Sequence, residues 1–315
     1  MAHSSPVPPL NLIWRRDTIG RVVEASFIKD VLLGALDRPV RQIVFGGDNE
    51  RIFADDMLIV VRHANPATAD NIGYVAEARR RGCRNLGILH MGDEKGDIDL
   101  GFYTDADYVL RNYYFPQALT APPGARPRSI QWIPNGYANA VGPQPTDRHL
   151  PMRHRSIVGF FAGQTAADPT TKRGEMICVA QENRLPCVVV GTQGFAQGLS
   201  PVEYAGHLAN ARFALVPAGN SEETIRLYDA LEAGAIPVAL KAPFLAAANA
   251  IENPPFVLLD AWADLAPFMA DYQKRAAADP DFMEDRRLAT ARWWTAFKRQ
   301  TAERVAALIG PTPGK

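Results

Sequence analysis

The chain has 315 residues, 47% of them hydrophobic and 22% charged, and its 34 basic residues balance 34 acidic ones. This length favours two domains of about 150 residues each. Nucleic-acid binders need a basic face to recruit phosphates, and a net charge of zero gives no reason to expect one, so no nucleic-acid partner is expected, although local basic clusters remain possible. No apolar run reaches the roughly 18 residues of a membrane helix, so no integral membrane span is expected.

The cysteines and the N-terminal residues indicate the cellular compartment of the protein. Three cysteines form no C-x-x-C pair, and an odd number cannot be fully disulfide-bonded within one chain, which suits a reducing compartment. The first residues, MAHSSPVPPLNLIW, lack the basic-then-apolar order of a signal peptide. We therefore expect a cytoplasmic protein.

The first half alternates between helical and strand-like patterns. In chain order it predicts a helix over 20–36, strands over 40–45 and 57–61, a helix over 71–82, and strands over 85–91, 106–114 and 130–134. The Pro- and Gly-rich stretch 135–155 has no sustained periodicity and predicts a linker.

The second half resumes the alternation and ends in helices from residue 261 onward. It predicts strands over 156–163, 187–191, 212–217, 235–240 and 256–260, with helices over 173–184, 201–211 and the charged segment after Pro217. Alternating strands and helices imply parallel sheets covered on both faces. The sequence therefore predicts an α/β fold of two Rossmann-like domains facing a cleft, residues 1–150 and 151–315, with a C-terminal helical tail.

The stretch FALVPAGNSEETIRLYDALEAGAIPVAL places a charged helix between two buried strands. Asn220 or Ser221 is predicted to cap the start of this helix. Glu222, Arg226 and Asp229 would share one face of it, at i, i+4 and i+7. From spacing alone, these charges also fit an exposed helix whose acidic first turn satisfies the helix dipole.

This stretch also carries a family resemblance. Its order Pro-x-Gly, Thr-x-Arg-x-x-Asp-Ala and Gly-x-Ile-Pro-Val resembles the donor-site segment of exostosin-like glycosyltransferases, most closely the ribitol xylosyltransferase branch. A second match, LGILHMGDEKGD with ADYVLRNYYFP, resembles their acceptor-side segments. The matching residues of the first segment are Arg226, Tyr228, Asp229, Ala230, Ile236, Pro237 and Val238.

The resemblance implies a GT-B architecture in which the C-terminal domain holds a nucleotide sugar. It implies inverting, metal-independent transfer from a UDP-sugar to a hydroxyl of a glycan or polyol-phosphate acceptor, as in polysaccharide biosynthesis. No cofactor is expected, so cationic side chains must stabilise the departing diphosphate. The family usually has Glu where this chain has Asp229, which is one methylene shorter.

On the donor side, a Gly after a strand lets backbone approach the ligand, and basic residues at a helix start neutralise diphosphate. Lys172 and Arg173 also fit a solvated helix start without any ligand. The predicted donor-binding residues are Gly163, Lys172, Arg173, Gly219, Asn220, Ser221, Glu223, Thr224, Arg226 and Asp229.

On the acceptor side, an inverting transfer needs a base to take the proton of the acceptor hydroxyl. His90, Asp93 and Glu94 follow a predicted strand, and Glu94 or Asp93 is the favoured base, with His90 third. Adjacent carboxylates in a turn also fit helix capping. Arg111 and Asn112 are predicted to bind the acceptor, although both also fit polar residues that simply close a strand.

Two other readings compete. Asp97-Ile-Asp99 and Asp105-Ala-Asp107 match the bare D-x-D pattern of metal-dependent transferases, but the residues before Asp97 are not a long apolar strand. A non-catalytic sensor of a nucleotide or sugar would use the same two-domain layout, and turnover separates it from an enzyme.

Overall fold

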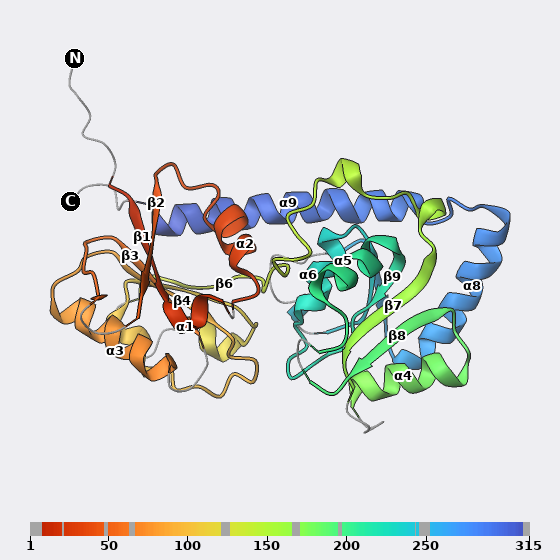
Figure 1. Ribbon diagram of the computed structural model, residues 1–315, viewed down its shortest axis with the longest axis horizontal. Coiled ribbons are helices and arrows are strands. Elements are labelled where there is room, and N and C mark those ends of the chain that lie inside the picture. The colour runs from red at the N-terminus through yellow and green to blue at the C-terminus, as the bar shows by residue number, and fades with distance from the viewer. Residues whose placement is uncertain are drawn as a thin grey trace, which may run out of the picture. The chain divides into compact units, whose positions relative to one another are not determined.

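The computed structural model describes residues 8–20, 22–46, 50–62, 67–120, 127–165, 171–194, 197–242, 244–245 and 253–310 (Figure 1). The chain forms two compact units. Unit 1 comprises Met1–Pro134 and Arg299–Lys315, and unit 2 comprises Asn135–Lys298. The domain division expected from the sequence differs from this one in the placement of residues 135–150 and 299–315.

Unit 1 contains a six-stranded parallel sheet of order β2-β1-β3-β4-β5-β6. The helix α3 (Ala67–Arg80) packs against β3 and β4, and Tyr74 and Val75 of this helix enter the core. The strands are β1 (Leu10–Arg15), β2 (Val40–Phe45), β3 (Met57–Arg62), β4 (Leu86–Met91), β5 (Tyr108–Arg111) and β6 (Ile130–Trp132).

Two sequence-based predictions fail in unit 1. β1 was not predicted, because the polar Asn11 interrupts the apolar residues of LNLIWR, which follow a Pro-rich stretch; the strand lies between β2 and β3 and is buried over Leu10–Trp14. The helix predicted over 20–36 is shorter: α1 (Arg16–Ile19) follows β1 directly, and α2 (Ala25–Phe27) continues as a π-helical turn over Ile28–Leu32.

Unit 2 contains a five-stranded parallel sheet of order β11-β10-β9-β7-β8. Its strands are β7 (Ile157–Gln164), β8 (Cys187–Thr192), β9 (Ala211–Leu215), β10 (Ile236–Leu240) and β11 (Val257–Leu259). Its helices are α4 (Lys172–Glu182), α5 (Pro201–Asn210), α6 (Ile225–Glu232), α8 (Leu265–Ala278) and α9 (Glu284–Ile309).

The helices of unit 2 cover both faces of its sheet. α4 packs with α8, whereas α5 and α6 pack against β7, β9 and β10 (Figure 1). Right-handed crossovers require this division, because the chain moves from β7 to β8 in one direction and from β8 to β9 in the other. The last helix, α9, contributes Glu284–Lys298 to unit 2 and its remainder to unit 1.

None of the helices in the described part of the chain combines the length and apolar composition needed to cross a bilayer.

Candidate functional site

Each sheet has a topological switch point. Numbered along the chain, the strands of both units lie in the order second-first-third-fourth-fifth, with β6 added at the edge of unit 1. Connections leave the first and third strands in opposite directions, so ligands bind outside their carboxyl ends. The switch points therefore lie between β1 and β3 in unit 1, and between β7 and β9 in unit 2.

At the switch point of unit 2, strand β7 extends past the last residue that pairs with β9, so the carbonyl groups at the end of β7 have no hydrogen-bond donor in β9. The N–H groups of Gly159 and Thr165 both donate to carbonyls at β8. Backbone groups of successive strand residues point to alternate sides, so the carbonyls of Ala162 and Gln164 point toward β9. Because β9 pairs with β7 only as far as Phe160, other donors must satisfy these two carbonyls.

Two guanidinium groups supply those donors. Arg226 of α6 donates from Nε to the Ala162 carbonyl at 2.8 Å, and Arg173 of α4 donates from Nη1 to the Gln164 carbonyl at 2.6 Å. The two carbonyls are two residues apart, about 7 Å along a strand. Arg226 also stacks over the Phe161 ring, with 5.4 Å from its Cζ to the ring centroid. Two positive charges thus lie together where strand β7 ends.

Two glycines leave the space that these side chains occupy. A Cβ at Gly163 would overlap the Arg226 guanidinium, and a Cβ at Gly219 would lie 3.0 Å from Nη2 of Arg173. Thr224 accepts a bond from Arg226 Nη1 at 3.4 Å. Gly163, Arg173, Gly219, Thr224 and Arg226, five of the predicted donor residues, therefore lie around the end of β7.

The start of α6 corrects two predictions. Thr224 is the N-cap residue, not Asn220 or Ser221, and its side chain makes no capping bond. Ser221 Oγ instead accepts the N–H of Glu223 at 3.3 Å, so the chain makes one more turn before the helix. Glu222 is exposed and precedes the helix, so it does not share a helical face with Arg226.

The predicted Lys172 lies in a different environment from Arg173. It is exposed and forms an ion pair with Glu175 at 3.4 Å, within the first turn of α4. Thr171 caps this helix by accepting the Gly174 N–H at 3.0 Å. Lys172 is thus a solvated helix-start residue, and a role toward the donor stays a prediction.

The acidic residues around α6 hold the segment 135–144. Three buried carboxylates each accept a backbone N–H of this segment: Glu223 from Asn135 at 3.0 Å, Asp229 from Ala138 at 2.7 Å, and Glu232 from Gln144 at 2.7 Å. A Pro- and Gly-rich segment forms no ladder, so its N–H groups need such acceptors. These acids, which we call the acid clamp, therefore bind protein backbone.

Further bonds complete the acid clamp. Tyr204 donates to the second Asp229 oxygen at 3.0 Å, and Tyr228 donates to Glu223 at 2.8 Å. Glu232 also accepts bonds from Trp294 Nε1 at 2.6 Å and from Lys298 at 2.7 Å. Because both Asp229 oxygens already bind protein donors, its contact to a sugar nucleotide stays a prediction.

Sequence reasoning missed Glu232. The sequence feature that could have indicated Glu232 is its i, i+3 spacing from Asp229, which puts both carboxylates on one face of α6. That face packs against the segment 135–144, whose N–H groups have no partner strand.

In unit 1, the predicted acceptor-side residues lie where β4 and β5 end. Arg111 donates from Nη2 to Asp93 at 3.1 Å, and both side chains are buried, with 0% and 3% exposed. His90 is also buried, and its Nδ1 lies 2.6 Å from the Tyr103 hydroxyl. Burial raises the pKa of Tyr103 well above its usual value, so this hydroxyl stays protonated. The sequence did not indicate Tyr103.

The turn after β4 is fixed from β5. Asn112 accepts the Gly92 N–H through Oδ1 at 2.9 Å and donates its own backbone N–H to the His90 carbonyl at 3.1 Å. Of the three predicted bases, Asp93 and His90 thus bind protein groups inside the fold, and the half-buried Glu94 is the most accessible. The identity of the base stays a prediction.

The D-x-D pairs serve local structure. Asp107 accepts bonds from Arg79 at 2.8 Å and from the Leu86 N–H at 2.7 Å, and Asp99 accepts the Gly101 N–H at 2.9 Å. Across the described ranges, no three or more His, Cys, Asp or Glu side chains are arranged to hold a metal ion. Metal independence itself stays a prediction.

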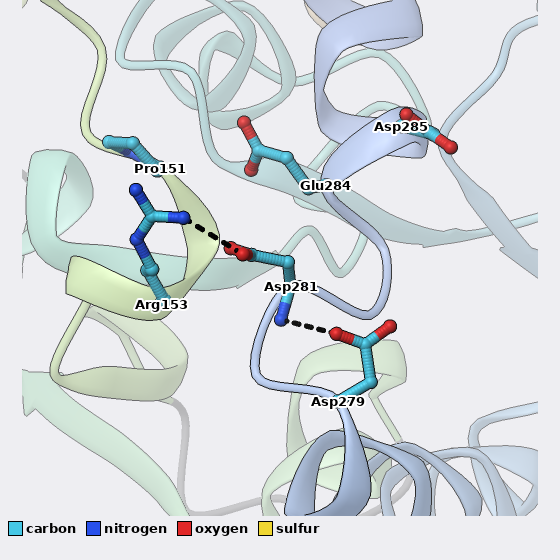
Figure 2. A pocket seen from close by; sticks show the side chains of 6 residues that line it. All are labelled: Pro151, Arg153, Asp279, Asp281, Glu284 and Asp285. Atoms are coloured by element: carbon cyan, nitrogen blue, oxygen red, sulfur yellow. Dashed lines mark hydrogen bonds and ion pairs between the residues drawn. The ribbon is translucent and has the colours of Figure 1, made fainter.

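Figure 2 shows a hollow in unit 2 that none of the predicted site residues lines. Arg153 forms an ion pair with Asp281 at 2.9 Å, and Asp279 accepts the Asp281 N–H at 3.0 Å. Glu284 accepts the Met152 N–H at 2.9 Å. These contacts tie the turn at 152–154 to the connection between α8 and α9, which is a structural role.

The comparisons with known proteins agree with this layout. Residues 176–311 match the family model described as the RXYLT1 C-terminal domain. No curated protein matches the chain significantly. Among solved structures, a glycosyltransferase from Rickettsia africae ESF-5 has a TM-score of 0.54 at 10% identity, covering 97% of this chain and 100% of that one.

Two other solved structures have lower scores. Sucrose-phosphate synthase from Thermosynechococcus elongatus has a TM-score of 0.46 at 15% identity, covering 80% of this chain and 72% of that one. UGT2 of Phytolacca americana, complexed with UDP-2fluoro-glucose and pterostilbene, has a TM-score of 0.45 at 9% identity, covering 96% of this chain and 100% of that one. The family match and the Rickettsia fold confirm the α/β fold of GT-B type and the resemblance seen in the sequence.

Proposed function

We propose that the chain is an exostosin-like glycosyltransferase that transfers a sugar from a UDP-sugar to a hydroxyl of a glycan or polyol-phosphate acceptor, a proposal that the family match over residues 176–311 and the glycosyltransferase fold support. The transfer inverts the anomeric carbon and uses no metal. The observation that supports this most is the pair of guanidiniums, Arg173 and Arg226, at the β7/β9 switch point. Planar guanidinium groups match phosphate oxygens through paired hydrogen bonds.

The reaction requires this cationic site most in the transition state. The acceptor oxygen attacks the anomeric carbon, the bond from that carbon to the diphosphate oxygen breaks, and its electron pair stays on UDP. Charge on the departing diphosphate rises in the transition state, where prearranged cations stabilise it most. Arg226 is prearranged by the Ala162 carbonyl and the Phe161 ring, so little reorganisation accompanies the step.

The acid clamp supports the donor site indirectly in this proposal. Asp229 and Glu232 fix α6 to the segment 135–144, and α6 carries Arg226. In unit 1, the turn that carries Asp93 and Glu94 supplies the acceptor side.

Calorimetry with UDP and a panel of UDP-sugars tests the proposal. We expect UDP and at least one UDP-sugar to bind; silence toward every nucleotide would remove the proposed function. Release of UDP from a bound UDP-sugar, alone or with candidate acceptors, then separates an enzyme from a sensor, which binds without turnover. Undiminished release in excess EDTA supports a metal-independent reaction, and loss of release under EDTA contradicts it.

A further inference from the structure

The segment 135–155 of unit 2 carries a half-buried histidine that packs against the C-terminal end of α6. His149 Nε2 lies 2.9 Å from the carbonyl oxygen of Glu232, the last residue of α6. Because a carbonyl oxygen only accepts, Nε2 carries the proton and donates in this bond. The last carbonyls of a helix have no N–H partner within it, and His149 satisfies one of them.

The other ring nitrogen is enclosed by protein. Within the described part of the chain, His149 Nδ1 is buried and makes no hydrogen bond. A Cβ on Gly234 would lie 2.4 Å from this nitrogen and 3.0 Å from Nη2 of Arg155, so the imidazole ring and the guanidinium pack against the same glycine. Nδ1 therefore faces a glycine and a cation.

Arg155 is that cation, and its bonds leave its charge in place. It is buried, with 1% exposed, and it donates to three backbone carbonyls. Nε and Nη1 bind those of Leu150 and Ala211, each at 2.8 Å, and Nη2 binds that of Ala233 at 3.4 Å. These carbonyls hold the guanidinium in position but carry no formal charge, so it remains a buried positive charge beside the ring.

The other charged groups around His149 belong to α6 and α9. Arg287 of α9 also acts electrostatically on the ring, and it donates to Glu284 at 2.9 and 2.6 Å. The carboxylate of Glu232 pairs with Lys298 at 2.7 Å. Both carboxylates of this neighbourhood are therefore already paired with other cations.

A second proton on the ring would bind at Nδ1, beside Arg155. Burial lowers the pKa of His149, the bond to the Glu232 carbonyl raises it, and the charges of Arg155 and Arg287 lower it, with a net lowering. The contacts and the charges agree: the fold accommodates the neutral ring and opposes the charged one.

We propose that His149 is an acid-sensitive latch that fastens the segment 135–155 to α6 while the ring is neutral and releases it when a proton from solvent binds to Nδ1. The same segment carries Ala138 and Gln144, whose N–H groups bind Asp229 and Glu232 in the acid clamp. Release would therefore expose these two amides to solvent. The inference is independent of the proposed function, because the latch requires neither donor nor acceptor and lies entirely within unit 2.

The latch should be closed at neutral pH and open in acid. Since the folded protein favours the neutral ring, His149 contributes fully to stability above the ordinary histidine pKa of 6.5, and this contribution falls as the pH drops below that value toward the lowered pKa. An ordinary histidine is almost fully charged at pH 5. The contacts of the segment should therefore weaken about 5- to 30-fold between pH 7.5 and pH 5.

Hydrogen–deuterium exchange of the segment tests the latch in the full chain at these two pH values, after correction for the intrinsic pH dependence of exchange. Wild type is compared with His149→Gln, because a glutamine amide can donate to the Glu232 carbonyl but takes up no proton. His154→Gln is the control, since His154 is an exposed histidine of the same unit.

In wild type and in His154→Gln, the protection of the Ala138 and Gln144 amides should fall about 5- to 30-fold at pH 5. In His149→Gln it should change less than about twofold. An acid response of wild-type size in His149→Gln would overturn the proposal, because the carboxylates of the acid clamp would then be the groups that titrate. Equal protection at both pH values in wild type would overturn it as well.

A second measurement needs no variant to fold as wild type does. NMR titration of the histidine rings in wild type should show His149 protonated at Nε2 at neutral pH. Its second proton should bind below pH 6.5, in step with the loss of amide protection. A His149 ring that titrates at or above pH 6.5, or that titrates while the two amides stay protected, contradicts the latch.

Discussion

The two sheets share one strand order, yet their switch points differ in their charged side chains. At β7 and β9, Arg173 and Arg226 bind the last carbonyls of a strand and concentrate positive charge. In unit 1, arginines end both strands, Arg15 in β1 and Arg62 in β3, and Arg62 and Glu94 both act electrostatically on Glu24. The same topology thus places two guanidiniums at the switch point of unit 2, and arginines together with a glutamate of raised pKa in unit 1.

The two units differ in the environment of their acidic side chains. Unit 2 is also rich in carboxylates near its switch point, but the acid clamp binds them to backbone N–H groups of 135–144. In unit 1, by contrast, burial raises the pKa of Glu24 to about 7.

The largest effect is expected at Glu232, which tests whether the acids of unit 2 are structural. Glu232→Ala removes the acceptor of Gln144, Trp294 and Lys298, and should lower the free energy of unfolding by about 3–5 kcal/mol. Urea unfolding measures it. The exposed Glu222→Ala should change stability by less than about 0.5 kcal/mol. A Glu232→Ala protein of wild-type stability would refute the clamp.

Arg226 should come next, through binding instead of stability. Arg226→Ala removes one of the two guanidiniums and should weaken UDP affinity about 10- to 150-fold, equivalent to about 1.5–3 kcal/mol. Calorimetry measures it, with the exposed Arg275→Ala as a matched control in the same unit. Unchanged UDP affinity in Arg226→Ala would mean that the β7/β9 switch point is not the diphosphate site.

The two glycines sharpen the geometry of that site. Gly163→Ala places a methyl group against the held guanidinium of Arg226, and should cost about 1–3 kcal/mol of stability, UDP affinity or both. Gly219→Ala meets only the end of the Arg173 side chain, at 3.0 Å, which can move, so its effect should be smaller. In an Arg226→Ala background, the stability cost of Gly163→Ala should largely disappear, which a double-mutant cycle measures.

Arg62 gives the smallest expected effect, and it belongs to unit 1. Because its charge lowers the pKa of Glu24, Arg62→Gln should raise that pKa further. A carboxyl whose pKa is raised by folding stabilises the fold at low pH and loses this contribution as the pH rises through the folded pKa, so the loss of stability from pH 5 to pH 8 should be larger in Arg62→Gln than in wild type. Urea midpoints at the two pH values measure it, and an equal loss in both proteins would contradict the electrostatic link between Arg62 and Glu24.

Most strands could be predicted because each is a short apolar run bounded by polar or turn residues, as in 57–61 and 235–240. β1 was missed because Asn11 interrupts its apolar run, although the fold buries Asn11 together with the apolar residues of the strand. The start of α6 was misplaced because Asn220 and Ser221 are good caps by type, whereas the extra turn depends on Glu223 reaching Asn135 far along the chain.

The residues of the candidate site also divide into those that could be predicted from the sequence and those that could not. Arg226, Arg173 and the two glycines could be singled out because a strand, a glycine and a helix start follow one another locally in the sequence. The raised pKa of Glu24 could not be predicted, because nothing in the neighbouring sequence shows that this side chain is buried. Its pKa depends on Arg62 and Glu94, which come from other strands of the sheet.

The sequence by itself determined the alternation of strands and helices, the two-unit organisation and the charged segment that resembles exostosin-like glycosyltransferases, because these properties are local or periodic. Only the tertiary structure decided which charges bind backbone and which remain available to a ligand. The physical reason is that burial, partner donors and neighbouring charges fix the state of an ionisable group, and the fold brings these together from distant parts of the chain.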